Sequence, residues 1–217
     1  MSHFVHACFI TLSVALCALL VGLVLGTALG WLLAQGRLLA RFIAQGVTII
    51  FRGLPELLML FIVYYGGNAL LSTLFPGAHL ALSPFIAGSI ALSFSFSGYA
   101  AQLIQAAVRA IPATQAESGA ALGLSTTQTF FRILLPQMAQ HALPGLGNLW
   151  QILLKDTALV STLGLAELMQ WAQLEANRIH TPFTYYLWAA LMYAVFCLLS
   201  EYGLRRQQQR LRARQYL

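Results

Sequence analysis

Residues 7–34 read ACFITLSVALCALLVGLVLGTALGWLLA and contain no charged side chain. As a helix this run would be about 42 Å long, more than the roughly 30 Å of a bilayer's hydrocarbon core. The run therefore predicts a membrane-spanning helix. Gly22, Gly26 and Gly30 recur at i+4 and share one helix face. This spacing predicts close packing against another helix, with the ordinary tolerance of glycine in membrane helices as the alternative.

The composition of the whole chain supports a membrane protein. Of its 217 residues, 59% are hydrophobic and 8% are charged, whereas a soluble domain carries about 25% charged residues. The formal net charge is +6, but the arginines lie mostly between apolar segments or near the C-terminus. We therefore interpret them as topology signals and expect no nucleic-acid partner. The cysteines lie in apolar runs without metal-ligand or redox spacing: Cys8, Cys17 and Cys197.

Four more apolar segments predict an all-α integral membrane protein with about five transmembrane helices. The segments are 42–74 (interrupted at 52–56), 84–108, 138–160 and 183–202. No repeat or linker marks a second domain, so we expect one transmembrane domain over 1–217. Within it, a cytoplasmic segment at 109–137 and a basic cytoplasmic tail at 203–217 are expected.

The arginines predict the orientation of these spans. With five spans, nine arginines fall on one side and only Arg178 on the other. By the positive-inside rule the first side is cytoplasmic, so the N-terminus lies outside and the C-terminus lies inside. The nine are Arg37, Arg41, Arg109, Arg132, Arg205, Arg206, Arg210, Arg212 and Arg214.

The segment 109–137 has the features of a docking element. Small residues follow Glu117, Gly123 is placed to end a helix, and Ser125 with Gln128 forms a capping pattern for the next helix. From Glu117 to Pro136 the sequence resembles the EAA signature of ABC importer permeases, E-A-A-x3-G-x9-I-x-L-P. Ser118 and Gly119 replace the usual two alanines, which preserves small size. The alternative is a loop of small residues that binds nothing.

The resemblance extends over nearly the whole chain, through stretches such as Arg52-Gly53-Leu54-Pro55-Glu56 and Leu154-Lys155-Asp156-Thr157. It implies a type I ABC importer permease of the polar amino-acid branch, similar to arginine and histidine permeases, in a bacterial inner membrane. The implied substrate is a basic amino acid: arginine first, with histidine, lysine or ornithine as other candidates. The implied partners are ABC ATPase subunits, a second permease chain (homologous or identical) and an extracytoplasmic binding protein. The implied ATPase-coupling residues are Glu117, Ser118, Gly119, Ala121 and Gly123.

Enzymatic chemistry is not indicated by any motif. The sequence has no glycine-rich phosphate-binding motif, no metal-ligand spacing and no nucleophile–base set. We expect no catalytic residue, metal or cofactor on this chain, with Mg-ATP bound by the partner ATPase. A stand-alone carrier or channel is the alternative. Such proteins usually show internal repeats or an ion relay in the spans, and neither pattern is found here.

A cationic substrate within a membrane needs a carboxylate partner. Glu56 follows Arg52 by four residues and Glu175 precedes Arg178 by three, so each acid is expected to pair with that arginine. Asp156 is expected either to pair with another helix or to line the pathway. Glu167 has no cation within four residues and is the first candidate for the substrate carboxylate, with an exposed loop acid as the alternative.

Other candidates for lining the pathway are Tyr64, Tyr65 and the serine run of Ser93, Ser95 and Ser97. The alternative is that the serine hydroxyls bond to carbonyls of the preceding helical turn. Pro144 and Gly145 interrupt the fourth apolar segment. One interpretation is that the backbone there is irregular and lines a cavity; the other is that this position lies at the membrane interface.

Overall fold

The computed structural model describes residues 2–76 and 80–213, and all regular structure within them is helical. Residues 77–79, between the second and third predicted spans, and residues 214–217 of the predicted tail lie outside this range. The elements are α1 (Ser2–Gln35), α2 (Leu38–Gly53), α3 (Glu56–Phe61), the π-helical η1 (Ile62–Gly66), α4 (Gly67–Leu74), α5 (Pro84–Arg109), α6 (Thr114–Ala121), α7 (Thr126–Thr129), the π-helical η2 (Phe130–Leu134), α8 (Leu135–Asp156), the 3-10 turn η3 (Thr157–Leu163), α9 (Leu168–Ile179) and α10 (Pro182–Ala213).

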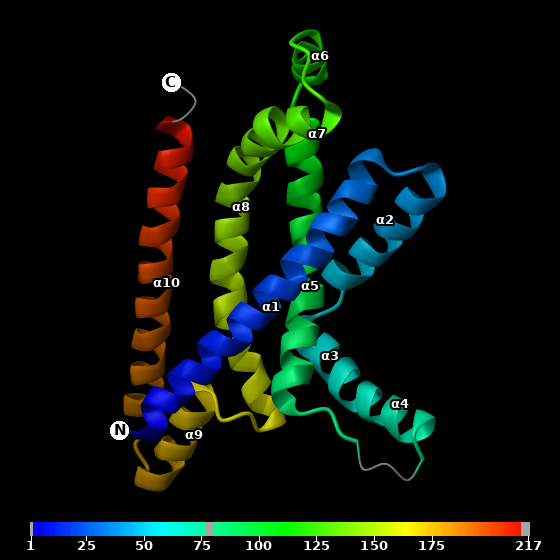
Figure 1. Cartoon of the computed structure of the whole chain (residues 1–217). Helices are drawn as coiled ribbons and strands as arrows, with labels where there is room; N and C mark the ends of the chain where they lie inside the picture. The colour runs from blue at the N-terminus through cyan, green and yellow to red at the C-terminus, as the bar shows by residue number, and fades with distance from the viewer. Residues whose placement is uncertain (1, 77–79, 214–217) are drawn as a thin grey trace.

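Three helical stretches among the described residues are both long and apolar enough to cross a membrane: His3–Gln35, Glu56–Leu74 and Pro182–Gln209. The two other predicted spans correspond to α5, with 26 residues, and α8, with 22 residues. At 1.5 Å per residue these helices are about 39 and 33 Å long, so length permits both to span. They are more polar because they lie inside the bundle, where α5 is central (Figure 1).

The glycine stripe of α1 packs against α5, as the spacing predicted. A Cβ on Gly22 would lie 2.8 Å from Phe96 Cδ1, and one on Gly26 would lie 2.7 Å from Ala100 Cβ. At Gly30 it would lie 2.7 Å from the Ala101 carbonyl oxygen. Side chains larger than hydrogen are therefore excluded along this face, and the close approach lets α1 cross α5 over much of its length (Figure 1).

The second predicted span is broken into two helices. Leu54 has extended backbone angles (φ −87°, ψ 136°), as expected for a residue that precedes proline, and α3 begins after Pro55. Arg52 therefore ends α2, while Glu56 begins α3. Among the described residues the ion pairs are Arg178–Glu175 and Arg205–Glu201. The predicted Arg52–Glu56 pair was wrong because the two residues do not share a helix, whereas the Glu175–Arg178 pair is confirmed at 2.8 Å.

The fourth predicted span is one continuous helix despite its proline and glycines. Pro144 lies inside α8, which runs without interruption from Leu135 to Asp156. A Cβ on Gly145 would lie 2.8 Å from the methyl groups of Leu103 on α5. This glycine therefore provides a close helix–helix contact and does not open the backbone.

The bundle has two distinct ends. The α1–α2 turn, the α6–α7 segment and the C-terminal end of α10 lie at the top of Figure 1. The N-terminus, the end of α4 and α9 lie at the bottom. This separation matches the two groups of segments that the arginine distribution distinguished.

Candidate functional site

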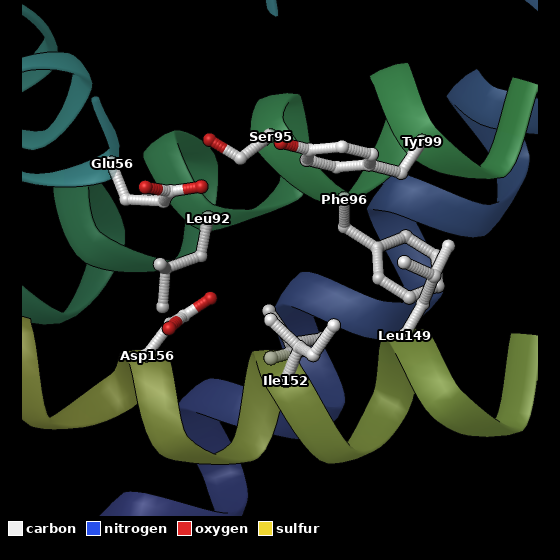
Figure 2. Close-up of a pocket in the computed structure, with 9 residues that line it drawn as sticks. Glu56, Leu92, Ser95, Phe96, Tyr99, Leu149, Ile152 and Asp156 are labelled. Atoms are coloured by element: carbon white, nitrogen blue, oxygen red, sulfur yellow. The ribbon is translucent and has the colours of Figure 1, made fainter. Parts of the chain in front are cut away.

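A small pocket opens between α3, α5 and α8, with a volume of about 20 Å³. Its lining is mostly apolar, with a few polar side chains directed into it (Figure 2). The lining residues are Glu56, Leu92, Ser95, Phe96, Tyr99, Leu149, Ile152, Leu153 and Asp156. The α5 members are spaced three and four residues apart, as are the α8 members, so each helix contributes one face.

Two carboxylates reach this pocket from different helices. Glu56 is the first residue of α3 and Asp156 is the last residue of α8. Figure 2 shows both carboxylates directed into the same space, with Leu92 between them. Neither forms an ion pair with a described residue. The pocket therefore offers two acceptor groups that have no ion-pair partner among the described residues.

Two further polar groups lie beside the carboxylates. The Ser95 hydroxyl is buried and has no hydrogen-bond partner among the described residues. The ring of Tyr99 lies along the pocket with its hydroxyl end toward Ser95 (Figure 2). On this ring rests the Arg52 guanidinium, whose Cζ is 5.2 Å from the ring centroid. A mostly apolar pocket with a few convergent polar groups is the usual form of a small-molecule site.

Glu167, the first sequence candidate, lies outside this pocket. Its side chain is fully buried, so it is not an exposed loop acid. It caps α9 by accepting from the Gln170 N–H at 2.9 Å, and it accepts from the Tyr193 hydroxyl at 2.9 Å and the Thr11 hydroxyl at 3.3 Å. Burial raises the pKa of this carboxyl above its ordinary value, and these hydrogen bonds partly oppose the shift. Its carboxylate joins α9 to α1 and α10.

Three other pathway candidates also lie away from the pocket: Ser97, Tyr64 and Tyr65. Ser97 is fully buried, and its hydroxyl donates to the Phe94 carbonyl at 2.8 Å, as the alternative interpretation of the serine run proposed. Tyr64 and Tyr65 belong to η1, with ring centroids 5.1 Å apart, and Tyr65 is 61% exposed. Of the sequence candidates for the pathway, the pocket includes Asp156 and Ser95.

The predicted coupling segment forms two short helices joined by a fixed turn. Gly123 has φ +76°, a left-handed conformation that favours glycine and ends α6. Ser125 then caps α7: its hydroxyl accepts from the Gln128 N–H at 3.2 Å, and the Gln128 side chain accepts from the Ser125 N–H at 3.0 Å. Both local predictions are confirmed.

Within this segment one small residue packs against the chain itself. Gly119 is buried, and a Cβ there would lie 2.7 Å from the Thr129 side chain on α7. Glu117, Ser118, Ala121 and Gly123 are exposed on the same segment. The four exposed residues face away from the chain, whereas Gly119 holds α6 against α7.

The coupling segment also contacts the bundle. Phe130 of η2 packs edge-on against Trp31 near the end of α1, with ring centroids 5.7 Å apart. Gln137 of α8 donates to the Gln115 side chain of α6 at 3.3 Å. The segment is therefore connected to both α1 and α8.

Sequence reasoning identified Ser95 as a pathway candidate but missed Glu56 and Tyr99 as pocket residues. Glu56 was assigned to Arg52 because a continuous helix was assumed across Pro55. The available signal was the proline itself, which separates residues 52 and 56 into different helices. For Tyr99, the signal was its i+4 spacing from Ser95 on one face of a mostly apolar span.

The chain is similar to known transport proteins over most of its length. The family model described as "Binding-protein-dependent transport system inner membrane component" matches residues 9–213. The arginine ABC transporter permease protein ArtQ of Escherichia coli K12 is 44% identical over 90% of this chain and 89% of its own length. The histidine/lysine/arginine/ornithine transport system permease protein HisQ of the same strain is 33% identical over 88% of this chain and 86% of its own.

A solved structure has the same architecture. A chain from a crystal structure titled as an amino acid ABC transporter with histidines superposes with a TM-score of 0.81 and 26% identity, over 96% of this chain and 94% of that one. The predicted all-α, type I importer fold is therefore confirmed, as are the membrane location and the resemblance noted in the sequence. The chain belongs to the ABC importer permeases, in their polar amino-acid branch.

Proposed function

We propose that this chain forms the translocation pathway for a basic amino acid, with arginine as the first candidate and histidine, lysine or ornithine next. The observation that supports this most strongly is the pair of carboxylates, Glu56 and Asp156. Both are directed into one pocket, and neither has an ion-pair partner in the described chain. A carboxylate at membrane depth is costly unless it meets a cation. Two acidic side chains suit a guanidinium or ammonium group. The substrates named for the two curated relatives support this class.

The substrate carboxylates in this proposal are Asp156 and Glu56, which take the place that Glu167 held in the sequence interpretation. Glu167 already accepts three hydrogen bonds within the chain and is fully buried. Binding a substrate there would require breaking the joint between α1, α9 and α10. Tyr64, Tyr65 and Ser97 are not needed for this first contact with the cation.

A second permease chain, identical or homologous, completes the pathway. The pocket in one chain has a volume of about 20 Å³, which is room for about one water molecule. An amino acid needs more space, so the pocket has to widen where this chain meets its partner. The α3–α4 arm projects away from the bundle (Figure 1) and leaves Tyr65, Leu70 and Leu74 exposed. We assign this arm to the chain–chain contact.

The energy comes from separate ATPase subunits that bind the α6–α7 segment. Glu117, Ser118, Ala121 and Gly123 form the docking surface, and Gly119 acts by fixing α6 on α7. Mg-ATP is bound by that partner. The segment's contacts with α1 and α8 support its role in transmitting movement to the pathway.

In this proposal the chain forms one transmembrane domain, 1–217, in a bacterial inner membrane. The end of the bundle that carries α6 and α7 faces the cytoplasm. This orientation places the C-terminal end of α10 inside and the N-terminus outside. The gathering of the α1–α2 turn, α6–α7 and the end of α10 at one end of the bundle supports it. An extracytoplasmic binding protein delivers substrate to the opposite end, which carries α9.

The substrate class is tested with the purified permease–ATPase complex in proteoliposomes. ATP hydrolysis is measured with the matching binding protein and a panel of arginine, histidine, lysine, ornithine and glutamine. We expect stimulation by the cationic amino acids, arginine most strongly, and little by glutamine. Equal stimulation by glutamine would contradict a site selective for cations.

The coupling surface is tested by charge reversal at Glu117. Glu117→Arg should abolish co-purification of the ATPase together with uptake, because an exposed anion at the docking surface becomes a cation. Glu175→Arg is the matched control, since Glu175 lies on α9 at the opposite end of the bundle. The proposal fails if Glu117→Arg retains both the ATPase and normal uptake, or if the control loses the ATPase equally.

A further inference from the structure

Arg52 lies at the middle of the bundle, beside the acidic pocket. Its aliphatic stem packs on Gly98, which is near the middle of α5: a Cβ on Gly98 would lie 2.8 Å from Arg52 Cγ. Its guanidinium lies over the ring of Tyr99, with Cζ 5.2 Å from the centroid. Tyr99 also lines the pocket that contains Glu56 and Asp156. Tyr99 therefore contacts the Arg52 cation and also lines the pocket that holds the two carboxylates.

The Arg52 cation has no anionic partner in the described chain. Its Nε is buried without a hydrogen-bond partner, and the ion pairs of the described residues involve other arginines. The contact with Tyr99 is worth about 0.5–2 kcal/mol, but it leaves the buried Nε–H donor without an acceptor among the described residues. An unpaired charge at membrane depth marks a functional position. The missing partner is an anion with two acceptors, which matches the fork of a guanidinium.

The charges around Tyr99 complement a basic amino acid as a whole. Such a molecule carries a cationic side chain at one end and an α-carboxylate at the other. Glu56 and Asp156 suit the cationic end, and they cannot bind the carboxylate without repulsion. The Ser95 and Tyr99 hydroxyls can donate hydrogen bonds to this carboxylate, but its charge calls for a cation. Arg52 is the arginine that touches a pocket-lining residue in the described chain.

We infer that Arg52 is a specificity-determining residue that binds the α-carboxylate of the transported amino acid while Glu56 and Asp156 bind its side-chain cation. This inference rests on the proposed function and adds the second half of the recognition. It requires the guanidinium to move from the Tyr99 ring to the substrate, and rotation about the three methylene groups of the arginine side chain allows such a change without moving α2. The site then rejects amines that lack a carboxylate.

The test compares arginine with agmatine, its decarboxylated analogue, as ligands of the detergent-purified permease–ATPase complex without binding protein. Equilibrium binding is measured for the wild type, Arg52→Met and Arg52→Lys. We expect Arg52→Met to bind arginine about 10- to 100-fold more weakly. Its affinity for agmatine should be unchanged or higher, so the preference for arginine collapses. Arg52→Lys keeps the charge but loses the planar fork, so its preference should fall between the two.

Arg41→Gln is the matched control because Arg41 is an exposed arginine on the same helix. It should keep the wild-type preference. A parallel loss of both ligands in Arg52→Met, or an unchanged ratio, would overturn the inference and indicate that Arg52 is structural or pairs with the partner chain or a lipid phosphate. If Arg52→Met does not assemble, an unchanged ratio in Arg52→Lys overturns it equally. Failure of the proposed function looks different: the wild type then binds neither ligand, and substitutions at Glu56 and Asp156 change nothing.

Discussion

The chain holds two acidic sites of opposite character. Glu167 is fully buried and accepts hydrogen bonds from Thr11, Gln170 and Tyr193. Glu56 and Asp156 are only half-buried, share a pocket and lack an ion-pair partner in the described residues. A carboxylate whose bonds are complete within the chain stabilises the fold. A pair whose bonds are incomplete is available to a ligand. The completeness of the bonding, more than depth in the bundle, separates the two roles.

The strongest test of this comparison removes the charge from both pocket acids. The double substitution Glu56→Gln and Asp156→Asn should lower uptake of arginine by at least about 100-fold, because each lost charge-assisted contact is worth roughly 1.5–3 kcal/mol. The melting temperature of the complex should stay close to that of the wild type, because neither acid completes a bond inside the chain. Uptake above a tenth of the wild-type rate would remove the pocket from the pathway.

The converse substitution at the buried joint should affect stability first. Glu167→Ala removes the cap of α9 and leaves the Tyr193 hydroxyl without its acceptor, so we expect a loss of about 2–4 kcal/mol. Thermal unfolding of the purified complex followed by tryptophan fluorescence measures it. Glu175→Ala is the control on the same helix. It breaks only a partly exposed pair with Arg178 and should cost less than about 1 kcal/mol. Similar melting temperatures for the two variants would contradict the assigned joint.

The pH dependence of stability sharpens the same contrast. Burial raises the pKa of Glu167 above its ordinary value of 4.5, so the folded chain favours the protonated form. The resulting stabilisation is complete below pH 4.5 and is lost as the pH rises through the raised pKa. Glu167→Gln cannot ionise and should lack this loss. The melting temperatures of the two proteins should therefore diverge in favour of the glutamine variant as the pH rises. Parallel curves would show that Glu167 does not titrate in this range.

The smallest expected effect concerns a single donor of the joint. Tyr193→Phe removes the hydroxyl that donates to Glu167 at 2.9 Å and keeps the ring. A typical hydrogen bond contributes about 0.5–1.5 kcal/mol, so thermal unfolding should shift by less than in Glu167→Ala. Combining the two substitutions should cost little more than Glu167→Ala alone, because both remove the same bond. Fully additive costs would place the tyrosine outside the network.

Local sequence signals predicted the parts of the fold that depend on neighbouring residues. The uncharged run at 7–34, the glycine stripe at 22, 26 and 30, and the cap at Ser125 were each readable because the cause lies within a few turns of helix. The type of fold came from the same periodicity together with the coupling signature.

The site was less predictable because it joins residues far apart in the sequence. Asp156 was identified as a candidate, but its partner Glu56 lies one hundred positions earlier and was hidden by the assumed pairing with Arg52. Glu167 ranked first because it has no nearby cation in the sequence. Its actual partners, Thr11 and Tyr193, lie on other helices and are neutral donors. Tertiary contacts of this kind leave no local pattern.

The contact between Gly119 and Thr129 has a mechanical consequence. Gly119 packs α6 closely on α7, and Gly123 and the Ser125 cap define the turn between them. We therefore expect the two short helices to move as one unit. In the mechanism that we propose, a displacement of α6 by the ATPase moves η2 by the same amount. The movement is then passed on to the helices that line the pathway. A larger side chain, as in Gly119→Val, would push α6 away from α7. ATP hydrolysis would then continue without driving transport.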